Sequence, residues 1–160
     1  MNQIRTWAWN VLHGLALVWI GMLLGVSFLA TPVKFLAPSL TLAVALDVGR
    51  QTFSVFAMLE VVAALVLLTA AMLIRSQRQV VVFVCLISAL VALQFFWLLP
   101  VLDARVEVIL QGEMPEESHL HSVYIAIEAA KLALLAGISW CTRAASLERS
   151  TGAAADARSL

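Results

Sequence analysis

The sequence predicts an all-α integral membrane protein: a four-helix bundle with short helical extensions on the outer side. Of its 160 residues, 62% are hydrophobic and only 12% are charged. A soluble domain has roughly 45–50% apolar and about 25% charged residues. Four apolar segments each approach the roughly 20 residues that a helix needs to cross a bilayer. No β-barrel alternation is present, and helices then satisfy the backbone within lipid.

The first predicted helix covers residues 9–30. Its apolar run exceeds the roughly 7–15 residues of a signal-peptide core, and Phe28-Leu-Ala30 has a bulky residue where a cleavage site needs a small one. We therefore predict an uncleaved membrane helix, which Pro32 and Pro38 end. Gly21 and Gly25 form a GxxxG pattern, which predicts a contact face for a homo-oligomer or a partner membrane protein.

The second predicted helix covers residues 52–74 and has an extension before it. No proline interrupts the chain from Ser39 to Ile74. A helix of that length would span roughly 54 Å, against an apolar core of about 30 Å. We expect residues 39–51 to lie outside the membrane, with Ser39 as a cap and Gly49 as the break point.

The third predicted helix covers residues 80–99 and also continues beyond the membrane. Pro100 can kink a helix without ending it. Helical periodicity then runs to Leu110, and Gly112 is a plausible C-terminal cap. The two extensions, residues 39–51 and 100–111, are expected to form an outer cap. Its possible ion pairs involve Asp47, Arg50, Asp103 and Arg105.

The fourth predicted helix covers residues 122–141 and completes a transmembrane domain over residues 1–143. Ser118 is its expected N-cap. Residues 144–160 are rich in Ala, Ser and Arg and are predicted to form a disordered cytoplasmic tail. Basic residues set the orientation: Arg5, Arg75, Arg78 and the tail arginines gather on one side. The positive-inside rule then places both termini in the cytoplasm, with the protein in a bacterial inner membrane.

Polar side chains lie inside three of the four apolar segments. Glu60, Gln94 and Glu128 each stand about 22–24 Å from the arginines at the inner boundary. Lys131 follows one turn after Glu128, within i,i+3 reach. A charged residue in a spanning helix costs at least about 2.5–3.5 kcal/mol, so these groups are expected to face inward. Together they predict a polar layer near the outer face of the bundle.

This layer is the predicted functional site. Two carboxylates and one ammonium leave a net charge of −1 unless a proton or cation binds. His121 and Tyr124 share the helical stripe of Glu128 and Lys131 and lead toward the outer water. The predicted ligand-, ion- or proton-binding residues are Glu60, Gln94, His121, Tyr124, Glu128 and Lys131. The alternative is that the cluster only specifies how the helices pack.

Metal binding, catalysis and assembly are the alternative functions. His119, His121 and Asp103 are suitable metal ligands by type. However, the two histidines are two positions apart, and the Glu-x-x-His pairs of di-iron bundles are absent, so no metal or cofactor is assigned. Nucleophilic triads, P-loops and dinucleotide fingerprints are also absent, which favours binding or transport over catalysis. An assembly subunit and a metal- or redox-dependent membrane enzyme remain alternatives. The formal net charge of zero gives no indication of a nucleic-acid partner.

Four short stretches carry a resemblance to a known group of proteins. They are Leu12-His-Gly-Leu-Ala-Leu-Val-Trp-Ile-Gly21, Phe28-Leu-Ala-Thr-Pro-Val-Lys-Phe35, Val48-Gly-Arg-Gln-Thr-Phe53 and the segment from His121 to Glu128. Over residues 10–140 the chain resembles small bacterial four-helix membrane proteins of a domain-of-unknown-function family. That family is related to the eukaryotic transmembrane proteins associated with cisplatin resistance and, more distantly, to the copper-resistance D type. The resemblance implies four helices in the inner membrane, and it implies no catalytic residue.

Overall fold

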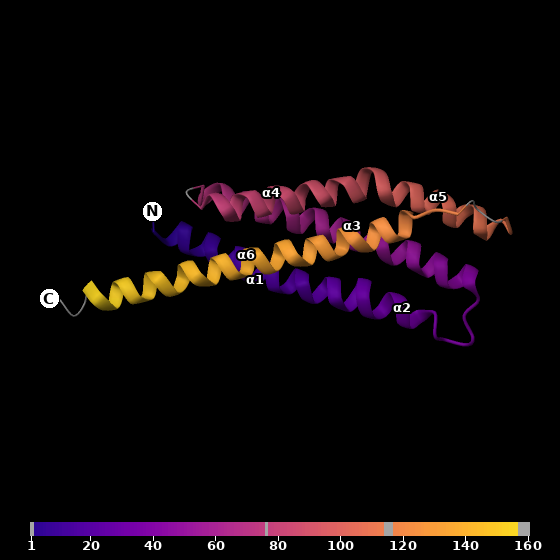
Figure 1. Cartoon of the computed structure of the whole chain (residues 1–160), viewed down its shortest axis with the longest axis horizontal. Coiled ribbons are helices and arrows are strands. Elements are labelled where there is room, and N and C mark those ends of the chain that lie inside the picture. The colour runs from indigo at the N-terminus through magenta and orange to yellow at the C-terminus, as the bar shows by residue number, and fades with distance from the viewer. Residues whose placement is uncertain (1, 76, 114–116, 157–160) are drawn as a thin grey trace.

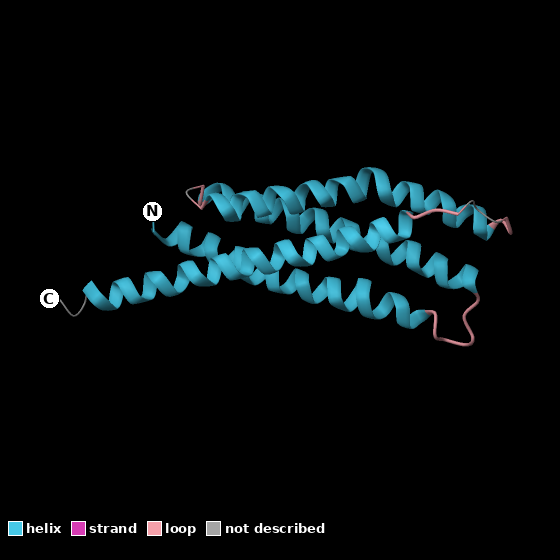
Figure 2. Ribbon diagram, viewed as in Figure 1, coloured by secondary structure: helices cyan, strands magenta, loops and turns pink. Residues whose placement is uncertain are grey.

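The computed structural model describes residues 2–75, 77–113 and 117–156 as four long helices, with no strand among these residues (Figures 1 and 2). The first and third long helices each consist of three consecutive helical elements, and the fourth continues past its predicted end. In chain order the elements are α1 (Asn2–Leu23), the π-helix η1 (Leu24–Ala30), α2 (Thr31–Lys34), α3 (Leu42–Leu73), α4 (Arg78–Leu93), the π-helix η2 (Gln94–Leu98), α5 (Leu99–Leu110) and α6 (Leu120–Asp156). The predicted all-α fold with four helices is confirmed.

The four helices form a closed ring. α1 packs against α3 and α6, and α4 packs against the same two helices. Both termini and the α3–α4 connection lie at one end, which we call the termini end (Figure 1). The α2–α3 and α5–α6 connections lie at the other, which we call the loop end. α5 contacts α3 there.

The core is built from one stripe of side chains on each helix. On α1 the buried residues are spaced three or four apart, which is the spacing of one helix face. The stripe consists of Ala8, Leu12, Ala16, Trp19 and Leu23, and Trp9 is buried next to it. The stripe on α4 and η2 consists of Val80, Val84, Ile87, Val91, Gln94 and Leu98. Polar residues that lie on such a stripe must therefore face into the bundle.

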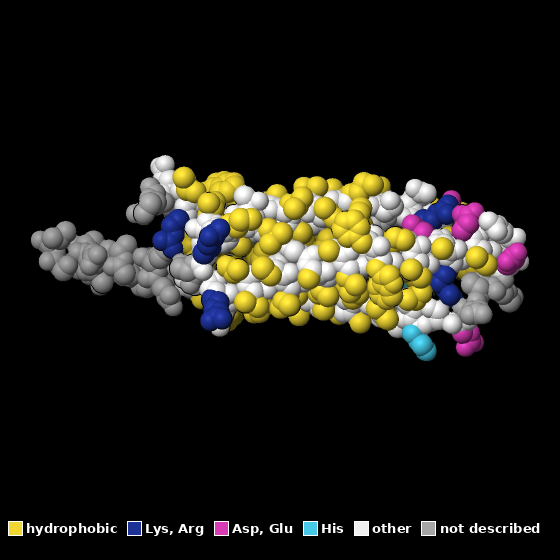
Figure 3. Space-filling view, turned by 90° about the horizontal axis from the view of Figure 1, so that it is seen from above, with side chains coloured by type: hydrophobic (Ala, Val, Ile, Leu, Met, Phe, Trp, Pro, Cys, Tyr) yellow, Lys and Arg dark blue, Asp and Glu magenta, His cyan; other side chains and the backbone are white. Residues whose placement is uncertain are grey.

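The outward faces of the helices are apolar as well. Val55 is 61% exposed, and Phe96 and Trp140 are each 77% exposed. All four helices are long and apolar enough to cross a membrane by length and composition. The charged side chains gather near the two ends of the molecule, with a largely uncharged band between them (Figure 3). A soluble monomer rarely exposes so much contiguous apolar surface.

The prediction that Pro32 ends the first helix is wrong, because the helix continues to Lys34. A proline lacks an N–H, and its ring clashes with the carbonyl four residues earlier. Here the π-helix η1 precedes it, and the Thr31 N–H donates to the carbonyl of Val26. The Thr31 hydroxyl donates to the same carbonyl at 2.8 Å. These wider turns let the chain pass the proline without breaking.

Pro100 is accommodated in the same way. The π-helix η2 precedes it, and the Leu99 N–H donates to the carbonyl of Gln94. The third helix therefore continues through α5, as predicted. Gly112 ends it with a φ of 85°, and the Glu113 N–H reaches back to the carbonyl of Val108 at 3.1 Å. This is the Schellman arrangement that favours glycine.

The expected break in the second helix is absent. α3 is continuous from Leu42, and its N-cap is Thr41 rather than Ser39. Gly49 is buried inside the helix. A larger residue would not fit there, because the ammonium of Lys34 occupies the space that a Cβ would need. An interior glycine costs about 1 kcal/mol in helix propensity. The hydrogen-bonded helical turns on either side of Gly49 outweigh this cost, since α3 is continuous there.

The fourth helix is longer than predicted. The expected N-cap was Ser118, but the helix begins at Leu120 and His119 is the residue before it, whose carbonyl accepts from the Val123 N–H at 3.0 Å. The Ser118 hydroxyl accepts from the Leu120 N–H at 3.1 Å. α6 then runs to Asp156, so it includes much of the 144–160 segment that we expected to be disordered. Alanine is the best helix former, which accounts for this continuation. Residues 157–160 lie outside the described residues.

Candidate functional site

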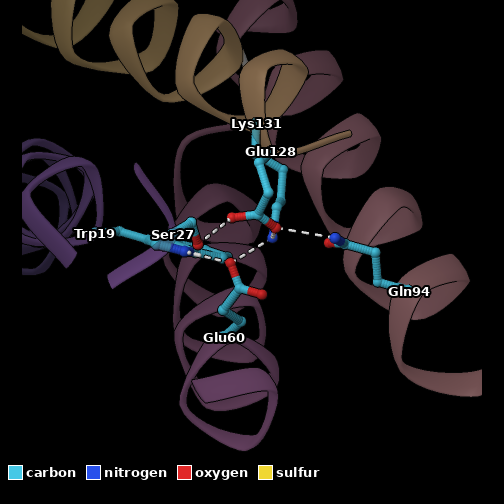
Figure 4. A network of polar contacts seen from close by, with 6 residues as sticks. All are labelled: Trp19, Ser27, Glu60, Gln94, Glu128 and Lys131. Atoms are coloured by element: carbon cyan, nitrogen blue, oxygen red, sulfur yellow. Dashed lines mark hydrogen bonds and ion pairs between the residues drawn. The ribbon is translucent and has the colours of Figure 1, made fainter. Parts of the chain in front are cut away.

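An ion network lies at the centre of the bundle, with Lys131 between two carboxylates. Its Nζ is 2.5 Å from Oε1 of Glu60 and 2.7 Å from Oε1 of Glu128 (Figure 4). The exposed fractions are 0% for Lys131, 4% for Glu60 and 1% for Glu128. The three charged side chains are therefore buried away from the surface of the bundle, and each depends on the others for charge compensation.

Hydrogen bonds from the remaining helices complete the network. Gln94 Nε2 donates to Oε1 of Glu128 at 2.9 Å, and the Ser27 hydroxyl donates to Oε2 of Glu128 at 2.8 Å. The indole N–H of Trp19 donates to Oε1 of Glu60 at 3.0 Å. All four helices thus contribute to one cluster, which holds both carboxylates in place by charge-assisted bonds.

The backbone explains why these groups meet. Glu128 and Lys131 are three residues apart on the inward stripe of α6, so their side chains are neighbours. Gln94 and Ser27 both lie in π-helical segments. Such segments change which residues face inward and often occur at functional sites. The prolines that follow the two π-helices therefore help to aim two donors at Glu128.

The structure brings together four of the six predicted site residues directly: Glu60, Gln94, Glu128 and Lys131. Sequence reasoning missed Trp19 and Ser27 as members of the network. Trp19 lies on the buried stripe of α1, and a buried indole N–H needs an acceptor. That requirement was the available signal for Trp19. The available signal for Ser27 was that it is the one hydroxyl in the apolar run of residues 24–30.

Tyr124 and His121 lie between this network and the loop end. The Tyr124 ring is buried and packs against Phe53 with centroids 5.0 Å apart. His121 is exposed. The stripe on α6 therefore leads from the exposed imidazole to the buried ions.

A cavity reaches Glu128 along this stripe. It has a volume of about 300 Å³, and Ser27, His121, Tyr124 and Glu128 are among its lining residues. A second cavity of about 240 Å³ shares His121 and Tyr124 with it. Aromatic side chains, including Phe35 and Phe53, line both. We call the first the Glu128 cavity and the second the Lys34 cavity, after a lysine that lines it.

The charges of the network do not balance. Two ionised carboxylates and one ammonium sum to −1 (−2 + 1), and the ion pairs among the described residues bring no second base to them. A buried uncompensated charge is costly, and a carboxyl avoids it by taking up a proton or a cation. Gln94 Oε1 is also buried without a hydrogen-bond partner. Its amide N–H group must face Glu128, because an ionised carboxylate only accepts.

The possible metal ligands are not brought together. His121 and Asp103 both line the Lys34 cavity, whereas His119 does not. Among the described residues, no group of three or more His, Cys, Asp or Glu side chains could hold a metal ion. A metal- or redox-dependent activity therefore stays a prediction without a site.

The loop end carries exposed ion pairs. Arg50 bridges Asp47 at 3.0 Å and Glu107 at 2.9 Å. The Asp47–Arg50 pair agrees with the sequence prediction, and the partner from α5 is Glu107 instead of Asp103. Exposed pairs of this kind contribute only about 0–1 kcal/mol. They fix α3 relative to α5 more than they stabilise the fold.

Comparison with protein families, with curated proteins and with solved structures found no match for this chain. The resemblance to the small bacterial four-helix proteins therefore stays a prediction.

Proposed function

We propose that this chain is a multi-pass protein of a bacterial inner membrane with both termini in the cytoplasm. The length and apolar surface of its four helices support insertion into a bilayer. Arg5, Arg75, Arg78 and Arg143 all belong to the termini end, and by the positive-inside rule this supports a cytoplasmic position for that end. The loop end then faces the outer side.

Within that membrane, we infer that the protein binds a small molecule, an ion or a proton as part of a transport-related role. One observation carries this inference. Glu128 lines a cavity of about 300 Å³ and at the same time pairs with Lys131 inside the bundle. A group used only for packing has no need of a cavity beside it. Ionisable residues inside a membrane are also rare and mostly functional.

The net charge of the network favours one kind of ligand in the Glu128 cavity. A ligand that enters the Glu128 cavity meets an acceptor-only carboxylate in a network of net charge −1. A proton or a small cation removes this imbalance, whereas an anion would increase it. The aromatic ring of Tyr124 lines the same cavity, and aromatic faces attract organic cations. The proposed occupant is therefore a proton, a small inorganic cation or an alkylammonium group.

Infrared spectroscopy of the purified protein in neutral lipid nanodiscs tests this proposal. We expect a protonated carboxyl band, or a shift of the carboxylate bands and a higher Tm when Na⁺, K⁺ or methylammonium is added. Glu60→Gln or Glu128→Gln should abolish the signal, because either change leaves the network neutral. Glu107→Gln is the matched control, since it removes an exposed carboxylate at the loop end. Two ionised carboxylates that respond to no cation would mean that the cluster serves packing alone.

A second candidate function is an assembly subunit that binds a partner membrane protein or a second copy. The observation that favours it is the position of Gly21 and Gly25. Both are exposed, and a Cβ added at either would meet no atom within 4 Å. Small outward residues let another helix approach closely in lipid. Crosslinking in membranes tests this candidate, and a protein that stays monomeric and without a partner contradicts it.

A further inference from the structure

The Lys34 cavity lies nearer the loop end than the ion network and has a different chemistry. Its polar lining includes Lys34, Arg50 and Arg105 against a single acid, Asp103. Apolar side chains such as Leu46, Leu99 and Ile109 make up most of the remaining wall. The Lys34 cavity is therefore mostly apolar with basic groups in its lining, whereas the charged group of the Glu128 cavity is an acid, Glu128.

Lys34 is the group in this cavity whose charge is not compensated. None of the ion pairs among the described residues includes it. Its Nζ lies instead 5.1 Å from the ring centre of Phe35 and 5.9 Å from that of Phe53. Cation–π contacts orient an ammonium without neutralising it. Gly49 leaves room for it, since a Cβ there would collide with Nζ.

Arg50 adds a second donor. Its two terminal nitrogens bind Asp47 and Glu107, but its Nε is buried without a hydrogen-bond partner. Arg50 is charge-balanced by these two acids, so what it offers a ligand is an N–H rather than a net charge. A buried donor left unpaired is unfavourable, and an anionic oxygen in the cavity would satisfy it.

The depth of this cavity matches that of a lipid head group. Lys34 lies about 43 Å along the helix from Arg5, and a bilayer with its head groups is about 40–45 Å thick. Under the proposed membrane placement, the cavity sits at the outer head-group level with its apolar wall toward the acyl chains. At about 240 Å³ it is smaller than the roughly 300–1,000 Å³ of typical small-molecule pockets. It suits a head group and the first part of one chain.

We propose that the Lys34 cavity binds an amphiphile with an anionic head, whose oxygen atoms pair with Lys34 Nζ and Arg50 Nε. The shared chemistry is a phosphate or carboxylate oxygen attached to an acyl chain, from an anionic phospholipid or a free fatty acid. This inference rests on the proposed membrane placement and not on ion binding at Glu128.

Native mass spectrometry of the full chain in a neutral maltoside detergent tests the proposal. The probes are dioleoylphosphatidylglycerol, oleate and, as the neutral reference, dioleoylphosphatidylcholine. We expect at least one anionic probe to bind about tenfold tighter than the neutral lipid, as one charge-assisted pair allows. Preference for phosphatidylglycerol would identify the phospholipid source, and preference for oleate the free acid.

Variants separate this site from general charge effects. Lys34→Met should reduce anionic binding to the level of the neutral lipid, and Lys34→Arg should retain it. Gly49→Ala should also weaken it, because the new Cβ displaces the ammonium. Arg78→Gln, which removes one positive charge at the termini end, should leave it unchanged. Equal binding of anionic and neutral probes, or full binding by both Lys34→Met and Gly49→Ala, would overturn the proposal.

Discussion

Lys131 of α6 and Glu60 of α3 form an ion pair of 2.5 Å inside the bundle, with exposed fractions of 0% and 4%. Arg50 and Glu107 form a pair of similar length, 2.9 Å, with half of the Glu107 side chain exposed. From the distances alone, the two ion pairs would be expected to contribute similarly to stability. Burial makes their energetic roles very different, since water screens the second pair and not the first.

Removing the buried cation should be strongly destabilising. Lys131→Met leaves two carboxylates facing each other without a counter-charge, and breaking a buried pair costs about 3–5 kcal/mol. The free energy of unfolding in mixed micelles measures this loss. The triple variant Glu60→Gln, Glu128→Gln and Lys131→Met should recover most of it, because the network is then uncharged. A Lys131→Met protein as stable as wild type would mean that the carboxyls are already neutral.

Removing the cation at the loop end should matter little, because its partner carboxylates are about half exposed. Arg50→Gln loses two ion pairs at the loop end, yet exposed pairs contribute about 0–1 kcal/mol each. Any loss should shrink as salt is raised, because the Debye length falls to about 3 Å at 1 M. Unfolding measured at low and high salt checks both points. A loss above about 3 kcal/mol, or one that salt does not reduce, would contradict this view of the pair.

Trp19 should be a structural part of the network despite its apolar ring. Trp19→Phe removes the N–H that donates to Glu60, and a bond to a charged acceptor contributes about 1.5–3 kcal/mol. Trp140→Phe is the matched control, since Trp140 is 77% exposed and should change stability by less than about 0.5 kcal/mol. Equal effects of the two substitutions would argue against the Trp19–Glu60 bond.

Two glycines test the helix packing independently of the site. A Cβ at Gly137 would lie 2.8 Å from the ring of Phe83, so Gly137→Ala should cost about 1–3 kcal/mol. A Cβ at Gly25 would meet nothing, so Gly25→Ala should be neutral or stabilise the helix by up to about 1 kcal/mol. The two unfolding free energies, measured together with the oligomeric state, check this. Loss of a dimer in Gly25→Ala would instead support the assembly function.

The sequence was sufficient to predict the four helices and the meeting of Glu60, Gln94, Glu128 and Lys131. Both follow from strong local rules: apolar periodicity, and the cost of a charge that faces lipid. Helix ends were predicted less well. Whether Pro32 stops a helix depends on a π turn and the Thr31–Val26 bond, and these are not visible in composition.

Partner choice between helices was also beyond the sequence. Asp103 and Glu107 are one turn apart on α5, and both could reach α3 by spacing alone. Which of them meets Arg50 depends on the register of α5 against α3, and only the packed structure fixes that register. Trp19 was passed over for a similar reason, because an aromatic residue on a buried stripe usually serves as core and its N–H partner lies on another helix.

We propose that the ion network is reached through the Glu128 cavity from the loop end. Modification of Ser27→Cys by a membrane-impermeant methanethiosulfonate reagent tests it most directly, because Ser27 lines that cavity beside Glu128. The background would replace Cys85 and retain Cys141, which lies toward the termini end and reports access from the other side. We expect rapid modification of Ser27→Cys from outside intact cells, faster with a cationic than an anionic reagent, whereas Cys141 should react only after permeabilisation. Modification of Ser27→Cys only from the cytoplasmic side, or no faster than at the lipid-facing control Leu24→Cys, would contradict it.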